Sequence, residues 1–174
     1  MFMKKVLFVF AIAMVSFGTV NAQETAGGLH FGGGLRFALP LGSMGDGYNF
    51  GIGAELQGEY MFSDMVSGTF TTGYTSFMGK ETEVMGITTK NPAMGYIPIL
   101  AGVRVYPSPT FFIGAKVGYG IMTASGFGSS GAFNYEPQIG YNGTKIQLAL
   151  GYNGLSQEGG TSSHMALSAI YKFN

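Results

Sequence analysis

The sequence contains no cysteine, which excludes disulfide bonds, thiolate metal ligands and a cysteine nucleophile. Charged residues are also scarce: they make up 10% of the chain, against about 25% in a typical soluble domain. After Ala22 no apolar run approaches the roughly 18 residues that a membrane-spanning helix needs. Basic and acidic residues number nine each, so no excess of positive charge indicates a nucleic-acid partner. The chain has too few charges to cover a water-facing exterior.

The first 22 residues have the pattern of a cleavable export signal. Lys4 and Lys5 precede an apolar run over residues 6–18, and residues 20–22 (Val-Asn-Ala) place small side chains where signal peptidase reads. We expect cleavage after Ala22, which leaves residues 23–174 as one exported domain; an uncleaved anchor helix is the alternative. Removal of the two lysines leaves seven basic residues (nine minus two) against nine acidic ones, a formal charge of −2.

Alternation of apolar and polar residues is the main signal in the rest of the chain. In residues 50–62, FGIGAELQGEYMF, every second residue is uncharged and mostly apolar, and Glu55 and Glu59 both fall on the other face. The same period recurs in eight segments whose length is close to the roughly 9–11 residues of a tilted strand that crosses a bilayer. These predicted strands are 29–39, 50–62, 66–76, 96–106, 111–121, 133–141, 145–153 and 165–173.

The connections between the predicted strands alternate in length. Short links at 63–65, 107–110 and Asn142-Gly143 alternate with long ones at 40–49, 79–95, 122–132 and 154–164. This wiring is typical of an outer-membrane barrel with tight periplasmic turns and longer outer loops. The fold class predicted is all-β: an eight-stranded antiparallel up-and-down transmembrane β-barrel. Aromatic residues at the strand ends predict two interfacial girdles, one with Phe31, Tyr60, Phe62, Tyr141, Tyr171 and Phe173, the other with Phe37, Phe50, Tyr74, Tyr119, Phe133 and Tyr152.

Every charged residue within a predicted strand falls on the face rich in glycine, serine and threonine. A lysine or arginine turned toward lipid at mid-depth costs about 2–4 kcal/mol, so the aliphatic face is predicted to meet lipid and the charged face to line the lumen. The predicted lumen charges are Arg36, Glu55, Glu59, Arg104, Lys116, Glu136 and Lys172.

These charges are predicted to pair. Side chains just fill the interior of eight strands, and a buried ion without a partner costs several kcal/mol. Strand adjacency and depth predict Arg36 with Glu55 and Lys116 with Glu136, and they predict Glu59 with Arg104 across the lumen. A salt-bridged plug is the favoured interpretation, and a proton or ion path is the alternative.

The export signal, the eight strands and the stretch YIPILAGVRVYPSPTFFIGAKVGYGI (residues 96–121) resemble the porin-like outer-membrane β-barrel domain, the small OmpA/OmpX-type barrels. The resemblance implies residence in the outer membrane, contact with its lipid and assembly by the barrel-insertion machinery. That machinery reads a last strand that ends in an aromatic residue, which Tyr171 and Phe173 match. Asn174 after the phenylalanine and Ser168, where the family tends to have glycine, depart from the pattern.

The function expected from this resemblance is structural or interactive. It involves no catalysis, no cofactor and no metal ion, and the loop from Gly79 to Gly95 is the candidate site for a surface partner. Three alternatives stay open: a narrow low-conductance pore, a lipid-modifying or proteolytic barrel enzyme, and a soluble lipocalin-like carrier with its aliphatic side turned inward.

Three further features lead to structural expectations: a candidate set of enzyme residues, two histidines and two prolines within predicted strands. An enzyme would draw on Ser162, Ser163, His164 and Glu158, but neighbouring residues on a strand point to opposite faces. His30 and His164 are predicted at opposite ends of the barrel, His30 at the rim or in the lumen and His164 in a loop, too far apart to share a metal site. Pro98 and Pro137 fall inside predicted strands, where proline removes a ladder hydrogen bond, so we expect bulges there.

Overall fold

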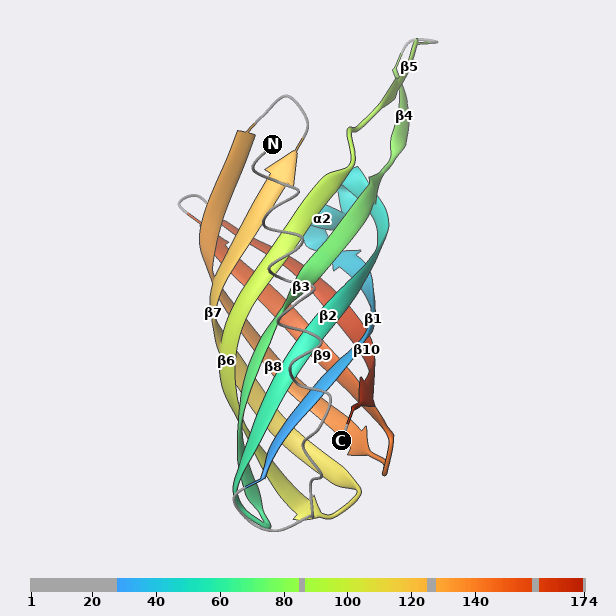
Figure 1. Cartoon of the computed structure of the whole chain (residues 1–174). Coiled ribbons are helices and arrows are strands. Elements are labelled where there is room, and N and C mark those ends of the chain that lie inside the picture. Colours follow the sequence, from blue (N-terminus) through green and yellow to red (C-terminus); the bar gives the residue numbers. More distant parts are fainter. Residues whose placement is uncertain (1–27, 85–86, 125–127, 158–159, 174) are drawn as a thin grey trace, which may run out of the picture.

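Eight antiparallel strands close into a barrel in the computed structural model, which describes residues 28–84, 87–124, 128–157 and 160–173 (Figure 1). The predicted export signal lies outside these residues. In their order around the wall the strands are β1 (Leu29–Leu41), β10 (Gly160–Lys172), β9 (Ile146–Gln157), β8 (Gly128–Asn142), β7 (Phe111–Ala124), β6 (Met94–Ser108), β3 (Val66–Gly79) and β2 (Tyr48–Ser63). All neighbours are antiparallel, and β1 pairs with β10 to close the wall. The predicted fold class is confirmed.

The two ends of the barrel differ. At one end, here the turn end, short connections follow β2, β6 and β8, and β1 begins beside the end of β10. At the other, the loop end, lie the helix α2 (Gly42–Gly47) and a separate hairpin of β4 (Glu81–Val84) and β5 (Ile87–Lys90). Figure 1 shows the hairpin projecting well beyond the rim. None of the helices in the described ranges is long and apolar enough to cross a membrane.

Several strands run farther toward the loop end than predicted. β8 begins at Gly128 rather than at residue 133, β9 continues to Gln157, and β10 begins at Gly160, so most of the predicted loops 122–132 and 154–164 is strand. The alternation of apolar and polar residues stops before the pairing does. Backbone hydrogen bonds can continue a strand beyond the apolar band without any alternation of side chains, and periodicity alone misses such an extension.

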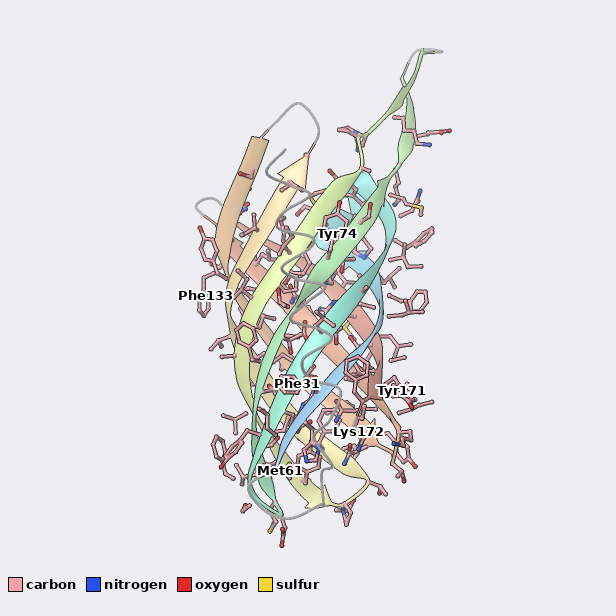
Figure 2. All side chains as sticks on the ribbon, viewed as in Figure 1. Phe31, Met61, Tyr74, Phe133, Tyr171 and Lys172 are labelled. Atoms are coloured by element: carbon pink, nitrogen blue, oxygen red, sulfur yellow. The ribbon has the colours of Figure 1, made fainter. Side chains whose placement is uncertain are left out.

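The two faces of the wall are sorted as predicted. Arg104 is 0% exposed and Glu59 5%, whereas Ile99, Leu148 and Leu167 are 43%, 42% and 49% exposed on the outside. The aromatic side chains of the two predicted girdles also lie outside; in Figure 2, Tyr74 and Phe133 lie nearer the loop end, and Phe31 and Tyr171 nearer the turn end. The soluble carrier, which requires the opposite sorting, is therefore wrong.

Glycines stand directly opposite several of the buried charges. Arg36 pairs in register with Gly53, and Arg104 with Gly114. A Cβ on Gly114 would lie 2.8 Å from Cγ of Arg104, which is too close for two carbon atoms. The glycine-rich face therefore gives the long charged side chains room inside a narrow barrel.

The bulges expected at Pro98 and Pro137 are absent from the described wall. Pro98 pairs in register with Gly120 of β7, and Pro137 with Ala115 of the same strand. On the other side of each proline the ladder lapses over two residues and then resumes in the same register. Each strand therefore accommodates the missing N–H by a local gap in pairing on one side, without an extra residue.

Candidate functional site

The lumen holds two layers of buried polar side chains, and the layer nearer the loop end centres on Glu136. Arg36 Nη1 donates to Oε2 of Glu55 at 2.9 Å, and its Nη2 pairs with Oε2 of Glu136. Lys116 Nζ lies 3.2 Å from Oε1 of Glu136, and Asn153 Nδ2 donates to Oε2 of the same carboxylate at 2.9 Å. We call this set, together with Tyr96 and Asn134, the loop-end network.

Tyr96 and two asparagines extend the loop-end network farther toward the loop end. Asn134 and Asn153 donate their amides to each other at 3.0 and 3.1 Å. Both also donate to the hydroxyl oxygen of Tyr96, at 2.7 and 3.1 Å. Side chains from β1, β2, β6, β7, β8 and β9 therefore meet in one connected network that crosses the lumen.

The second layer, the turn-end network, centres on Arg104. Its Nη1 donates to Oε2 of Glu59 at 3.0 Å and to Oε1 of Gln147 at 2.9 Å, and its Nη2 donates to Oε1 of Gln57 at 2.7 Å. The other carboxylate oxygen of Glu59 accepts hydrogen bonds from Ser67, at 2.6 Å, and Tyr106. The guanidinium carbon lies 4.3 Å from the centre of the Phe112 ring, a cation–π distance.

Apolar clusters cover both polar layers. At the loop end the cluster consists of Ala38, Met44, Phe77, Tyr96, Ala132 and Leu155, and Met44 comes from α2. At the turn end Tyr106, Phe112 and Ala149 pack together, with Met61 against them. Apolar side chains therefore pack against the charged centre of the lumen at both ends; at the turn end Gln147 also donates past them to Oδ1 of Asn142 at 3.3 Å.

His164 belongs to the loop-end cluster rather than to a loop, so its predicted position is wrong. Its ring is 0% exposed and meets Phe77 and Tyr96 edge to face, at centroid distances of 5.2 and 5.4 Å. Neither ring nitrogen has a hydrogen-bond partner among the described residues. The prediction failed because β10 begins four residues before His164, which places the ring inside the wall.

The structure shows all three predicted ion pairs of the lumen and, among the described residues of the lumen, one more. The additional pair joins Arg36 to Glu136. Lys172, by contrast, lies at the turn end, where its Nζ donates to Oδ1 of Asn142 at 3.1 Å. His30 lies opposite Glu59 in the register of β1 and β2, also near the turn end.

The predicted assembly signal faces outward. Tyr171 and Phe173 are 52% and 56% exposed, with ring centroids 6.3 Å apart. The backbone N–H of Phe173 donates to the carbonyl of Phe31 at 2.9 Å, which extends the pairing of β10 with β1 past the assigned end of the strand.

The predicted lumen set lacks seven side chains of the two networks: Gln57, Ser67, Tyr96, Tyr106, Asn134, Gln147 and Asn153. The signal that could have found them was alternation itself, because Tyr96 and Tyr106 fall on the same face of β6 as Arg104, and Asn134 on the same face of β8 as Glu136. Tyr96 and Tyr106 belong to neither predicted girdle, and the predicted lumen set was limited to charged residues.

Hydrogen bonds at the loop end tie the base of the β4–β5 hairpin to α2. The backbone N–H of Lys80 donates to the carbonyl of Gly47 at 2.9 Å, and Nδ2 of Asn91 donates to the same oxygen at 3.1 Å. Lys80 Nζ also donates to the carbonyl of Gly45. Lys90 and Glu81 form an exposed ion pair at 3.1 Å across the first rung of the hairpin. The projecting segment therefore rises from a hydrogen-bonded base.

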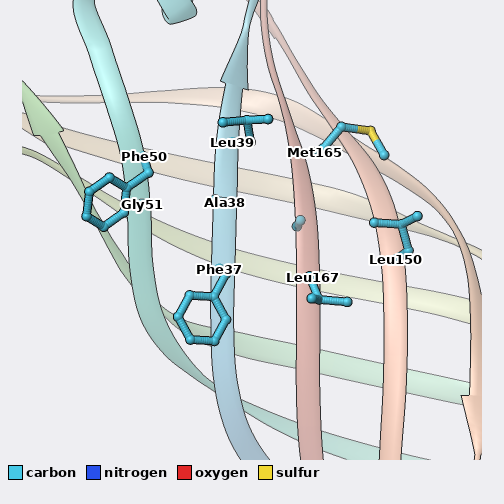
Figure 3. A pocket seen from close by; sticks show the side chains of 9 residues that line it. Phe37, Ala38, Leu39, Phe50, Gly51, Leu150, Met165 and Leu167 are labelled. Atoms are coloured by element: carbon cyan, nitrogen blue, oxygen red, sulfur yellow. The ribbon is translucent and has the colours of Figure 1, made fainter. Parts of the chain in front are cut away.

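The outer wall carries a shallow apolar groove of about 360 Å³ over the seam between β1 and β10 (Figure 3). The side chains around it include Phe37, Leu39, Phe50, Leu150, Met165 and Leu167. Its lining is almost wholly apolar, and it offers no group for chemistry.

The residues considered for an enzyme do not assemble at the outer rim. His164 is enclosed in the lumen, whereas Ser163, the next residue on the strand, faces the other side of the wall. Glu158 lies outside the described residues. Among the residues that the structure describes, no three His, Asp or Glu side chains lie close enough together to hold a metal ion.

A family model described as "Outer membrane protein beta-barrel domain" matches residues 8–173. No curated protein matches the chain in sequence. Among solved structures, the chain is similar to Ail, the attachment invasion locus protein of Yersinia pestis, with 15% identity and a TM-score of 0.58 over 85% of this chain and 99% of that one. A second structure of Ail contains the heparin analogue sucrose octasulfate; it has 16% identity and a TM-score of 0.57, with the same coverage. Neisserial surface protein A has 15% identity and a TM-score of 0.55 over 86% of this chain and 98% of that one. At sequence identities this low, the similarity shows a shared fold only.

Proposed function

The chain belongs to the outer membrane protein beta-barrel domain family, and from this premise we propose that it is a closed, non-catalytic barrel that presents its loop end to a partner outside the cell. The outer membrane is where this family resides, and the apolar exterior with its two aromatic girdles fits contact with outer-membrane lipid. In this proposal the turn end faces the periplasm.

The main support for a closed lumen is the pairing of its buried charges. Arg36, Arg104 and Lys116 are each at most 1% exposed, and each has a carboxylate partner within 3.2 Å. A solute passing through would have to part these ion pairs and the apolar clusters at both ends. Parting a buried ion pair leaves uncompensated charge at a cost of several kcal/mol, which supports a plug over a narrow pore.

The β4–β5 hairpin supports the surface role. It lies within the predicted interaction loop from Gly79 to Gly95, projects past the rim and rests on a base tied to α2 (Figure 1). Its charged residues balance, with Lys80 and Lys90 against Glu81 and Glu83. A site for a sulfated sugar, such as the one in the Ail structure, would need an excess of positive charge, which this hairpin lacks. We therefore propose that the partner is a protein surface.

Export and assembly complete the proposal. The export signal over residues 1–22 would bring the chain to the periplasm, and Tyr171 and Phe173, exposed at the end of the last strand, would be read by the insertion machinery. Replacement of both aromatic residues by alanine should lower the amount of folded barrel in the outer membrane.

A hairpin replacement tests the surface role. Residues 81–90 are exchanged for a short Gly-Ser turn, and the intact and exchanged chains, each in nanodiscs, are compared for binding to arrays of extracellular proteins and of glycans. Exposure of the hairpin on the cell surface is checked first: trypsin added to intact cells should cut after Lys80 or Lys90. A protein bound by the intact chain and lost on exchange supports the proposal. Binding that survives the exchange, or selective binding to sulfated glycans, contradicts it.

A further inference from the structure

One carbonyl oxygen at the end of α2 accepts hydrogen bonds from both ends of the β4–β5 hairpin. The carbonyl of Gly47 accepts from the backbone N–H of Lys80, the residue before β4, at 2.9 Å, and from Nδ2 of Asn91, the residue after β5, at 3.1 Å. Asn91 also donates its backbone N–H to the carbonyl of Lys80 at 3.0 Å. The hairpin therefore begins and ends at the same point of α2, which lies below it in Figure 1.

The direction of the hairpin depends on the contacts at its base. Its two strands of four residues form a sheet of their own within the described chain and do not pair with the barrel wall. An isolated two-stranded hairpin is only marginally stable in water, so its own hydrogen bonds do not fix how it projects. The base itself is tightly packed: a Cβ on Gly79 would lie 1.9 Å from the carbonyl oxygen of Asn91.

The helix α2 depends in turn on contacts outside itself. It has six residues, three of them glycine, and no side chain of the described residues caps its N-terminus. Isolated helices shorter than about 12–15 residues are marginal in water, and glycine lowers helix stability further. Met44 is the buried residue of this helix, with 6% of its surface exposed. The burial of Met44 and the hydrogen bonds to the hairpin base therefore stabilise α2 at two points.

Met44 packs among side chains of the barrel wall. The loop-end cluster that receives it contains Phe77 of β3, Tyr96 of β6 and Leu155 of β9, each at most 1% exposed. The hydroxyl of Tyr96 also accepts hydrogen bonds from the asparagines of the loop-end network. A continuous series of contacts therefore leads from the buried network through this cluster, Met44 and α2 to the hairpin outside the barrel.

We propose that α2 links the lumen to the outer surface, and that Met44 is a positioning residue for the hairpin although it lies inside the barrel. While Met44 is buried, α2 holds the Gly47 carbonyl where Lys80 and Asn91 both reach it, and the hairpin keeps one direction. If Met44 leaves the cluster, α2 loses its hold on the wall and the hairpin samples many directions. A partner that recognises one direction then binds more weakly, because only the molecules in that direction can bind.

The coupling between the hairpin and the lumen is reciprocal. A partner that binds the hairpin in its fixed direction stabilises the buried position of Met44, and with it the apolar cluster at the loop end. The inference rests on the proposed surface role for the meaning of this coupling and deepens that role. The direction of the hairpin can be measured without any partner, however, so the coupling and the surface role can fail separately.

A distance measurement between two nitroxide labels tests the coupling. The chain has no native cysteine, so Thr88→Cys in β5 and Leu148→Cys on the outer wall can be labelled specifically in the intact chain in nanodiscs. Double electron–electron resonance should give a narrow distance distribution for this chain and a broad one after Met44→Ala. Met44→Leu, which fills the same space, should keep it narrow. Met78→Ala is the matched control, because Met78 is exposed on the outward face of β3 beside the base, and it should also stay narrow.

The proposal is overturned by a broad distribution before any change at Met44, or by a narrow one in a folded Met44→Ala barrel. Broadening in Met78→Ala or Met44→Leu equal to that in Met44→Ala also overturns it. Heat-modifiable gel mobility checks that each variant folds. If Met44→Ala does not fold, Lys80→Met combined with Asn91→Ala decides, because it removes both side-chain hydrogen bonds to α2 at the rim and leaves the lumen unchanged. A narrow distribution in that variant overturns the coupling, whereas the hairpin replacement described above tests the surface role.

Discussion

Arg36 of β1 and Glu136 of β8 form an ion pair across the lumen, although β9 and β10 separate their strands in the wall. The hydrogen bonds of a barrel connect only neighbouring strands, so the wall itself does not link these two positions. Because Arg36 also bonds Glu55 of β2, one guanidinium joins opposite sides of the cylinder. The interior side chains therefore connect opposite sides of the wall as well as fill the lumen.

Glu136→Gln should be strongly destabilising. The change removes the carboxylate that Arg36 and Lys116 share and leaves two buried positive charges with Glu55 alone. Loss of one member of a buried pair typically costs about 3–5 kcal/mol, to be measured by urea unfolding in detergent and by heat-modifiable gel mobility. Glu81→Gln, which breaks only the exposed pair with Lys90, is the control and should cost less than about 1 kcal/mol. Equal losses in the two variants would argue against the bracing role.

Glu59→Gln should also lower the free energy of unfolding, because the amide can still meet Ser67 but no longer neutralises Arg104. Combining it with Arg104→Met should restore part of the loss, since an apolar side chain of similar length replaces a charge without a partner. A double-mutant cycle in urea measures this coupling. Strictly additive losses would show that the two residues do not act as a pair.

His164→Phe should be neutral or stabilising. The ring contacts Phe77 and Tyr96 edge to face, and neither of its nitrogens is paired within the described chain, so a phenyl ring keeps the packing and removes a buried polar group. His164→Ala, the comparison, leaves a cavity and should cost about 3 kcal/mol. If the phenylalanine variant loses as much stability as the alanine variant, the nitrogens have a role that the packing does not explain.

Gly34→Ala should prevent closure of the barrel. A Cβ at this position would lie 1.9 Å from the carbonyl oxygen of Ala169, which is backbone of β10 and cannot rotate away. At Gly58 the nearest atom to a Cβ is a ring carbon of Phe31 at 3.5 Å, an ordinary contact. We therefore expect little folded protein for Gly34→Ala and near-normal amounts for Gly58→Ala, measured as the heat-modifiable fraction in outer membranes. A well-folded Gly34→Ala barrel would contradict the tight seam.

The wall of the barrel and the sidedness of its strands could be predicted from the sequence because lipid imposes a strict period of two. The same reasoning placed Arg36 near Glu55 and Lys116 near Glu136, since those residues lie on adjacent strands at similar depth. It also predicted Glu59 with Arg104 across the lumen, which the structure shows. It did not give the pair of Arg36 with Glu136, because Glu136 had already been assigned to Lys116 and a second partner across the lumen depends on the diameter and stagger of the closed barrel.

The errors about His164 and about the strand ends fall where the lipid constraint ends. His164 and the upper parts of β8, β9 and β10 lie toward the loop end, where side chains need not alternate and strand pairing continues through the backbone alone. Met44 of α2 packs in the apolar cluster at the loop end, and the sequence of residues 42–47 does not predict this helix. The extra bulges at Pro98 and Pro137 were predicted from the lost hydrogen bond, but a gap in one ladder proved sufficient.

Electrical recording of the purified intact chain in a planar lipid bilayer tests the closed lumen most directly. With the buried charges paired and apolar clusters at both ends, we expect insertion without steady current steps. Reproducible steps of uniform size from the folded barrel would show an open path through its interior and contradict the account.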